Sequence, residues 1–64
     1  MNKYYIYRIN EYGRKEYFLG DKSFICWLAS TCGATSFDRF YDVIKMMEHI
    51  HETENIRVTD LHVE

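Results

Sequence analysis

The sequence predicts an α+β domain in which one amphipathic helix packs on one face of a small antiparallel sheet, in the order strand, strand, strand, helix, strand. Two observations support this prediction. Residues 3–20 contain two short runs rich in tyrosine and isoleucine, and residues 37–52 repeat apolar side chains at the spacing of a helix face. The 64 residues are expected to form a single domain, residues 1–64, because a chain this short supports only one core.

The first two strands are predicted at residues 3–10 and 16–20, with a polar turn between them. Gly13 lies in this turn and can supply the positive φ that a short hairpin loop requires. Residues 24–29 are β-branched and aromatic enough for a third strand, although periodicity alone leaves a buried helical turn as the alternative.

The first strand carries apolar side chains on both faces, because Tyr5, Tyr7 and Ile9 point one way while Tyr4 and Ile6 point the other. One helix can cover only one face, and soluble monomers rarely leave a large apolar face bare. We therefore predict a homodimer that buries the second face. The sequence leaves open which face the helix takes, so the candidate dimer interface draws on both faces: Tyr4, Tyr5, Ile6, Tyr7, Tyr17 and Leu19.

The helix is the clearest element and is predicted within residues 37–52. Asp38 is the expected N-cap, with Ser36 and Thr35 as alternatives, because short polar side chains can accept the unpaired N–H groups of the first turn. Residues 53–55 are expected to end the helix. Its apolar side chains form one stripe that should face the sheet: Phe40, Val43, Ile44, Met47 and Ile50, with His51 at its edge.

The last strand is predicted at residues 56–63, with a fault in its alternation. Ile56 and Val58 share one face, whereas Leu61 and Val63 lie on the other. A β-bulge near residues 59–60 would restore the phase; without one, the strand is apolar on both sides.

The sequence contains no catalytic, cofactor or metal-binding motif, so we expect no enzymatic activity, no cofactor and no metal site. Cys26 and Cys32 lack the close spacing of a zinc site, and His49 and His51 project about 200° apart on a helix. The two cysteines are expected to be free thiols; a bridge between them would require the intervening segment to turn back tightly.

Charge and hydropathy limit the classes of partner that the chain is expected to bind. Residues 1–33 carry five Lys/Arg and three Asp/Glu (+2), and residues 34–64 carry three Lys/Arg and seven Asp/Glu (−4). The overall acidic balance argues against general nucleic-acid binding, and the acidic second half suits a basic partner surface. The N-terminus lacks the apolar core of a signal peptide, and the longest apolar run is far shorter than the ~20 residues of a spanning helix. We expect a cytoplasmic protein without membrane contact.

The stretches YYIYRINEYGRKEYFLG and ATSFDRFYDVIKMMEHI, followed by a short last strand, resemble small proteins encoded by bacteriophages and prophages. This resemblance implies an anti-defence inhibitor of the anti-CRISPR type, which binds a host protein by stoichiometric contact in the cytoplasm of the bacterial host. It implies no particular functional residues. Two alternatives stay open: a single-stranded nucleic-acid module that stacks bases on the sheet tyrosines, and a structural or regulatory phage protein.

The partner surface is predicted on the solvent-facing side of the helix and its flanks. Apolar side chains hold a complex together more than rim charges do, so Tyr41 and Met46 are the expected anchors. The full candidate set is Asp38, Arg39, Tyr41, Asp42, Lys45, Met46, Glu48, His49 and Glu52.

Overall fold

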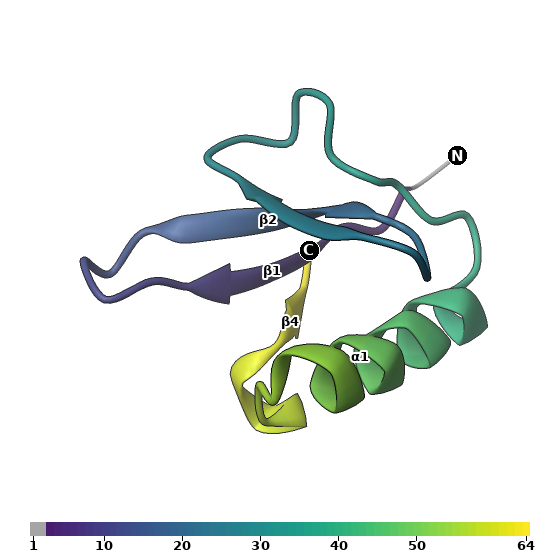
Figure 1. Cartoon of the computed structure of the whole chain (residues 1–64). Helices are drawn as coiled ribbons and strands as arrows, with labels where there is room; N and C mark the ends of the chain where they lie inside the picture. Colours follow the sequence, from purple (N-terminus) through teal and green to yellow (C-terminus); the bar gives the residue numbers. More distant parts are fainter. Residues whose placement is uncertain (1–2) are drawn as a thin grey trace.

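The computed structural model describes residues 3–64. Four antiparallel strands form one sheet in the order β3-β2-β1-β4, and the single α-helix lies along one face of it (Figure 1). The predicted α+β fold and order of elements are confirmed. The elements are β1 (Ile6–Ile9), β2 (Lys15–Gly20), β3 (Ile25–Leu28), α1 (Phe40–Glu54), a 3-10 turn (Val58–Asp60) and β4 (His62–Val63).

The β1–β2 hairpin forms where the sequence predicts it. Gly13 has a φ of 77°, and the side-chain oxygen of Asn10 accepts hydrogen bonds from the backbone N–H groups of Tyr12 (2.9 Å) and Arg14 (3.0 Å). An asparagine that binds the backbone of the following residues stabilises a tight turn. The hairpin places Tyr7 opposite Tyr17, so these two tyrosines share one face of the sheet.

The helix covers the face that carries Ile6, and this resolves the choice that the sequence left open. Ile6 and Phe18 are fully buried there, and Trp27 lies beside Phe18 with its ring at 66° and 6.1 Å. The tyrosines Tyr5 and Tyr7 occupy the other face. The buried cluster beneath the helix consists of Ile6, Phe18, Val43, Met47, Ile50 and Leu61.

The capping prediction is wrong for all three candidates. The helix begins at Phe40, and Arg39 is its N-cap without a side-chain hydrogen bond. Asp38 instead pairs with the Lys3 ammonium group, and Thr35 bonds to Gly20 in the sheet. At the other end the helix stops at Asn55, whose left-handed backbone (φ 57°) lets its N–H donate to the carbonyl of residue 51 at 3.0 Å.

The apolar stripe of the helix is narrower than the sequence pattern. Val43, Met47 and Ile50 are buried and Met46 packs against them, whereas Phe40 is 51% exposed and Ile44 is 40% exposed. His51 is also exposed, with Nδ1 2.8 Å from the carbonyl oxygen of Ile56. The stripe prediction is therefore wrong for Phe40, Ile44 and His51. Each helix residue turns by about 100°, and a sheet this small contacts only a narrow sector of the helix.

The third strand is confirmed, since Ile25–Leu28 pairs with β2, and the helical alternative is excluded. The long last strand with a bulge is wrong. A 3-10 turn at Val58–Asp60 interrupts it, closed by an Arg57–Asp60 ion pair at 3.0 Å, and only His62–Val63 pairs with β1. The turn changes the phase of the chain, so that Leu61 enters the core at 4% exposure.

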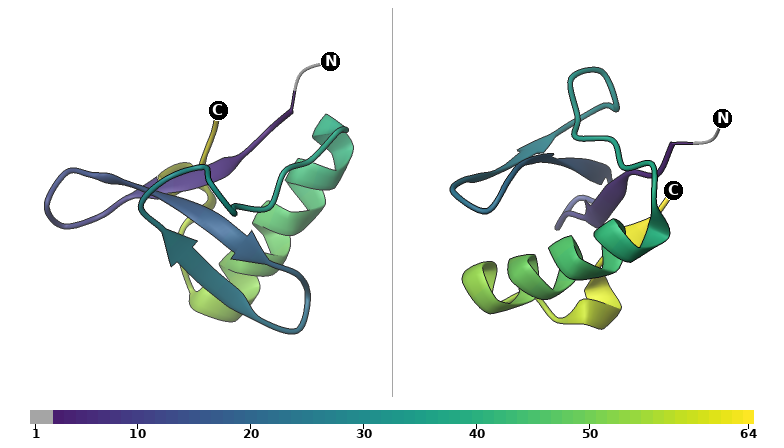
Figure 2. Two further views of the ribbon diagram at one scale, coloured as in Figure 1. Left: turned by 90° about the horizontal axis from the view of Figure 1, so that it is seen from above. Right: turned by 90° about the vertical axis from the view of Figure 1, so that its right-hand side faces the viewer.

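Residues 29–37, here called the crossing segment, connect β3 to the helix by a route that the sequence does not reveal. The segment rises on the side of the sheet opposite α1 and then returns beside β1 (Figures 1 and 2). The N–H of Thr35 donates to the carbonyl of Phe18 at 3.0 Å, and Phe37 exchanges two hydrogen bonds with Tyr4. A Cβ on Gly33 would lie 3.7 Å from Leu28, so the segment lies over the β3 end of the tyrosine-bearing face.

The chain has the accessible surface of an ordinary folded monomer. It exposes 4599 Å², close to the ~4,400 Å² expected for 7.8 kDa. The crossing segment and the mutual packing of the tyrosines therefore provide part of the cover that the sequence analysis assigned to a second copy. The single chain exposes no large excess of surface over that of a folded monomer of this mass.

Candidate interaction surfaces

Three neighbouring apolar side chains on the first half of α1 form an exposed cluster, here called the helix patch: Phe40, Tyr41 and Ile44. Their exposed fractions are 51%, 67% and 40%. Residues three and four apart lie side by side on a helix, which brings Ile44 next to both aromatic residues. The ammonium group of Lys45 lies 5.6 Å from the centre of the Tyr41 ring. The patch is thus apolar at its centre and charged at its edge.

The structure places most of the predicted partner residues around this patch. Asp42, Lys45 and Glu48 are exposed on α1, while Asp38 and Arg39 precede the first turn. Farther along, Lys45, Glu48, His49 and Glu52 line a shallow hollow of about 300 Å³ together with Lys22 from the β2–β3 turn.

Met46 does not join the other predicted anchor. It is partly buried and packs against the core, whereas Tyr41 points to solvent. Phe40 and Ile44, which sequence reasoning assigned to the core, take its place beside Tyr41. No signal in the periodicity could have separated them, because both fit the helical spacing of the stripe; only the width of the sheet decides which side chains it covers.

The second candidate surface is the tyrosine face, formed by Tyr5, Tyr7, Tyr17, Lys15, His62 and Glu64. The ring of Tyr7 stacks on His62 at 5.1 Å, and the Lys15 ammonium lies 4.7 Å from the Tyr7 ring centre. The hydroxyl group of Tyr17 donates to the Glu64 carboxylate, whose two oxygens lie 3.0 and 3.1 Å away. The same carboxylate pairs with Lys15 at 2.7 Å. The polar ends of this surface are therefore already bonded to one another.

These contacts shift the pKa values of all three groups. The hydrogen bond from Lys15, followed by that from Tyr17, lowers the pKa of Glu64 below its usual 4.5. The same bond raises the pKa of Lys15, while burial and then Glu64 raise the pKa of Tyr17. Lys15 and Glu64 remain an ion pair at neutral pH, so the lysine is already paired with an anion of the chain itself.

Glu64→Gln is expected to lower the melting temperature at neutral pH and to have little effect in acid. The depressed folded-state pKa of Glu64 stabilises the fold above its unfolded-state value, and this stabilisation is lost as the pH falls through the folded-state pKa. The difference between the melting temperatures of the two proteins should shrink as the pH falls below 4.5 and vanish once the pH lies below the folded-state pKa of Glu64. Glu48→Gln is the control, since Glu48 makes no ion pair within residues 3–64. A difference between wild type and Glu64→Gln that is constant with pH would contradict the assignment.

The six residues predicted at a dimer interface separate into two groups. Tyr4 and Ile6 lie on the face that the helix covers, where Ile6 is fully buried, so they belong to the interior of the single chain. Tyr5, Tyr7 and Leu19 are partly exposed on the tyrosine face. Tyr17 shares that face but is only 8% exposed, because Tyr5, Tyr7 and Glu64 pack around it.

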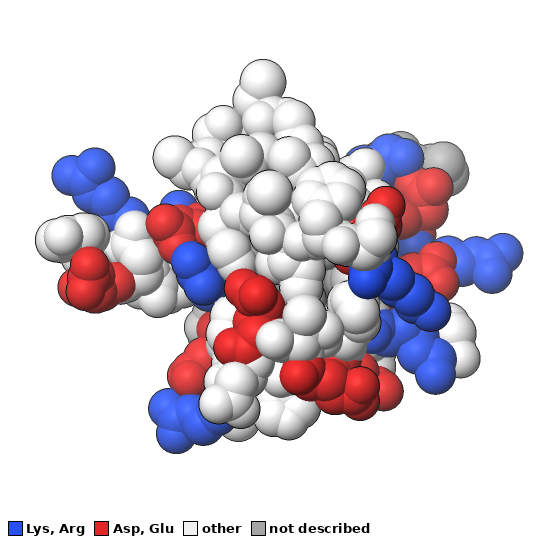
Figure 3. Space-filling model, viewed as in Figure 1, with Lys and Arg blue, Asp and Glu red and all other residues white. Residues whose placement is uncertain are grey.

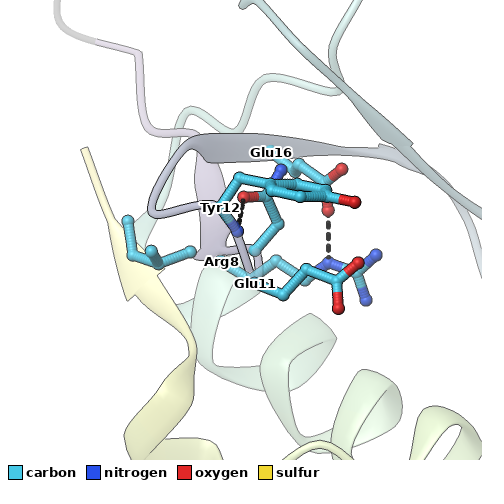
Figure 4. A pocket seen from close by; sticks show the side chains of 6 residues that line it. Arg8, Glu11, Tyr12 and Glu16 are labelled. Carbon is cyan, nitrogen blue, oxygen red and sulfur yellow. Dashed lines mark hydrogen bonds and ion pairs between the residues drawn. The ribbon is translucent and has the colours of Figure 1, made fainter.

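A second hollow, of about 370 Å³, lies at the β1–β2 hairpin and is shown in Figure 4. Two of its three charged side chains are paired, since Arg8 Nε donates to Glu16 at 2.9 Å, while Glu11 also lines the hollow. The guanidinium of Arg8 also lies 4.4 Å from the centre of the Trp27 ring, which holds it in place. The hollow offers an exposed aromatic ring, Tyr12, beside an ion pair, and this arrangement is suited to contact rather than to proton transfer.

Metal ligands and reactive thiols do not gather at any of these surfaces. Within residues 3–64, no group of three or more His, Cys, Asp or Glu side chains could hold a metal ion. Cys26 and Cys32 are free and exposed. None of the helices in this range has the length and apolar character needed to cross a membrane.

Comparison with known proteins gave no match: no family model, no curated protein and no solved structure is similar to this chain. The resemblance to phage proteins therefore depends on the sequence pattern alone.

Proposed function

We propose that the chain is a protein-binding module, and that it acts as a phage-encoded inhibitor of a bacterial defence component by occupying a surface of that component in the host cytoplasm. The helix patch is the observation that carries the binding proposal. Three large apolar side chains are exposed side by side at 40–67% on a rigid helix. The phage origin and the defence target rest on the sequence resemblance.

The anatomy of the helix patch favours a protein partner. Stable protein interfaces place aromatic and aliphatic anchors at the centre and polar groups at the rim. Phe40, Tyr41 and Ile44 provide the centre, and Asp42 and Lys45 provide rim charges of both signs. A rim of mixed sign is poorly suited to a polyanion, whereas it can match the alternating charges of a protein surface.

Tyr41→Ala is expected to weaken partner binding more than Lys45→Ala does, and Ile44→Ala should behave like Tyr41→Ala. Loss of a central anchor costs about 2 kcal/mol or more, which corresponds to roughly thirtyfold in affinity. All three side chains are exposed, so none of the changes should unfold the domain. The first assay is restoration of phage growth in bacteria with an active defence system. The defence component that is inhibited is then purified, and its affinity for each variant is measured by titration.

Tyr12→Ala serves as the matched control, because Tyr12 is also a tyrosine and is 79% exposed, but it lies in the turn between β1 and β2, outside the helix patch. Equal losses for Tyr41→Ala and Lys45→Ala would show that the helix patch is not the binding surface. If the unmutated chain restores phage growth against none of several defence systems, the inhibitor proposal is wrong. The helix patch could then bind another partner, such as a phage structural or regulatory complex.

The single-stranded nucleic-acid alternative is supported by one observation, the exposed stack of Tyr7 on His62. Stacking platforms bind unpaired bases without sequence preference. Against it, Lys15 is paired with Glu64 and the chain carries a net charge of −2. A gel shift with a thymidine oligonucleotide that is abolished by Tyr7→Ala and unaffected by Tyr41→Ala would favour this alternative. Tyr4 and Tyr17 are unsuited to this test, since both support the packing of the fold.

A further inference from the structure

The outer edge of β3 presents backbone hydrogen-bonding groups that have no partner among residues 3–64. The carbonyl of Phe18 and the backbone of Gly20 bond to Thr35, on the side of β2 that faces away from β3. In an antiparallel ladder, both backbone groups of a residue point to the same side, and the side alternates along the strand.

This alternation determines which residues of β3 direct their backbone N–H and C=O groups away from β2. Phe18 lies opposite Trp27, and Gly20 lies opposite Ile25. Since these β2 residues direct their backbone groups away from β3, Ile25 and Trp27 form non-hydrogen-bonded pairs with them and direct their own N–H and C=O groups outward. Outside the strand ladder, the backbone groups of Ile25 and Trp27 make no hydrogen bond within residues 3–64.

This edge also lacks the devices that keep edge strands apart. Soluble proteins protect such edges with lysine, proline, a bulge or a covering loop. No charged residue, histidine or proline occurs between Ser23 and Phe37. In Figure 3 the surface over β3 and the crossing segment accordingly appears as one uncharged area, with the charged side chains to either side and below.

We propose that β3 pairs antiparallel with β3 of a second copy, about a two-fold axis at Cys26. In this register Ile25 of each chain lies opposite Trp27 of the other, and the outward groups of both residues form four hydrogen bonds between the chains. The uncharged edge is electrostatically suited to a second copy: each chain carries a net charge of −2, and this contact brings no two like charges together. The result is a continuous eight-stranded sheet.

This arrangement replaces the face-to-face homodimer that the sequence suggests. The crossing segment rises over the β3 end of the tyrosine face and prevents two such faces from meeting flat (Figure 2). The edge of β3 is unobstructed by comparison. Because each chain already buries the core of a monomer, the pairing joins folded chains rather than completing their folding.

The register makes a chemical prediction. Cys26 of each chain would lie in a non-hydrogen-bonded cross-strand pair with Cα atoms about 4.5 Å apart, which is within the ~4.4–6.8 Å range of a disulfide. Cys32 is also exposed, so its cross-linking rate measures how fast two chains are oxidised through random collisions alone. With diamide as oxidant, which takes up the two electrons and two protons of the thiols, Cys32→Ser should form a covalent dimer at least about tenfold faster than Cys26→Ser.

The reduced protein gives an independent test. The amide hydrogens of Ile25 and Trp27 should exchange more slowly as protein concentration rises, and sedimentation should show a dimer that dissociates on dilution. Cys26→Lys should give a monomer at every concentration, since it brings two like charges face to face. Cys32→Lys should remain dimeric, and so should Tyr5→Glu, which would disrupt a face-to-face pair but leaves the edge of β3 unchanged.

Three results would overturn the proposal: equal cross-linking rates for Cys26→Ser and Cys32→Ser, exchange rates of Ile25 and Trp27 that are independent of concentration, or a dimer that survives Cys26→Lys and is lost in Tyr5→Glu. Cys26 is exposed, so its replacement should leave the monomer folded, and an unchanged circular dichroism spectrum would verify this.

Discussion

Phe18→Ala is expected to leave the chain largely unfolded at room temperature. Phe18 is fully buried at the centre of β2, with Trp27 at 6.1 Å on one side and Phe37 stacked at 6.3 Å on another. Truncation of a buried phenylalanine costs about 3–5 kcal/mol. A core of this size supplies about the same amount in total, so the loss would consume most of the stability.

Urea titration followed by circular dichroism would measure this effect. Phe24→Ala is the matched control, because Phe24 is of the same type and only a few residues away but is 50% exposed. Its midpoint should lie close to that of the wild type. A cooperative transition of Phe18→Ala with the same midpoint as Phe24→Ala would show that Phe18 is not the centre of the core.

Gly20→Ala is expected to destabilise the domain by about 2–5 kcal/mol, through backbone strain and overlap. Gly20 has a φ of 152°, and a Cβ there would lie 2.2 Å from the carbonyl oxygen of Phe24. That oxygen is part of the backbone and accepts the hydrogen bond from Asp21 that closes the β2–β3 turn, at 3.1 Å. Relief of the overlap would therefore open the hairpin.

The same substitution would disturb the crossing segment, because Gly20 holds Thr35 through two hydrogen bonds of 2.9 and 3.2 Å. Gly13→Ala is the control: its φ of 77° is also left-handed, but a Cβ there meets nothing within 4 Å. It should cost only about 1–2 kcal/mol. Equal shifts of the urea midpoint for the two variants would show that overlap with Phe24 contributes nothing beyond the backbone strain common to both.

Local chemistry and periodicity are enough to predict the elements on which the two signals agree. Asn10 and Gly13 specify the first hairpin within a few residues, and the spacing of Val43, Met47 and Ile50 specifies a helix. The types of secondary-structure element and their order along the chain follow from such local signals. The exposure of Tyr41 was predictable for the same reason, since it lies opposite the apolar stripe whichever face of the sheet the helix covers.

Which side chains stay exposed depends on packing between elements that are distant in the chain. Periodicity assigns Phe40 and Ile44 to the core, but a narrow sheet covers a narrow sector of the helix, and these two join Tyr41 in the helix patch. Periodicity likewise gives no route for residues 29–37, whose hydrogen bonds to Phe18 and Tyr4 join positions far apart in the chain. That route covers part of the tyrosine face and leaves the edge of β3 open, because burial depends on which segments meet in space, and local spacing carries no information about that.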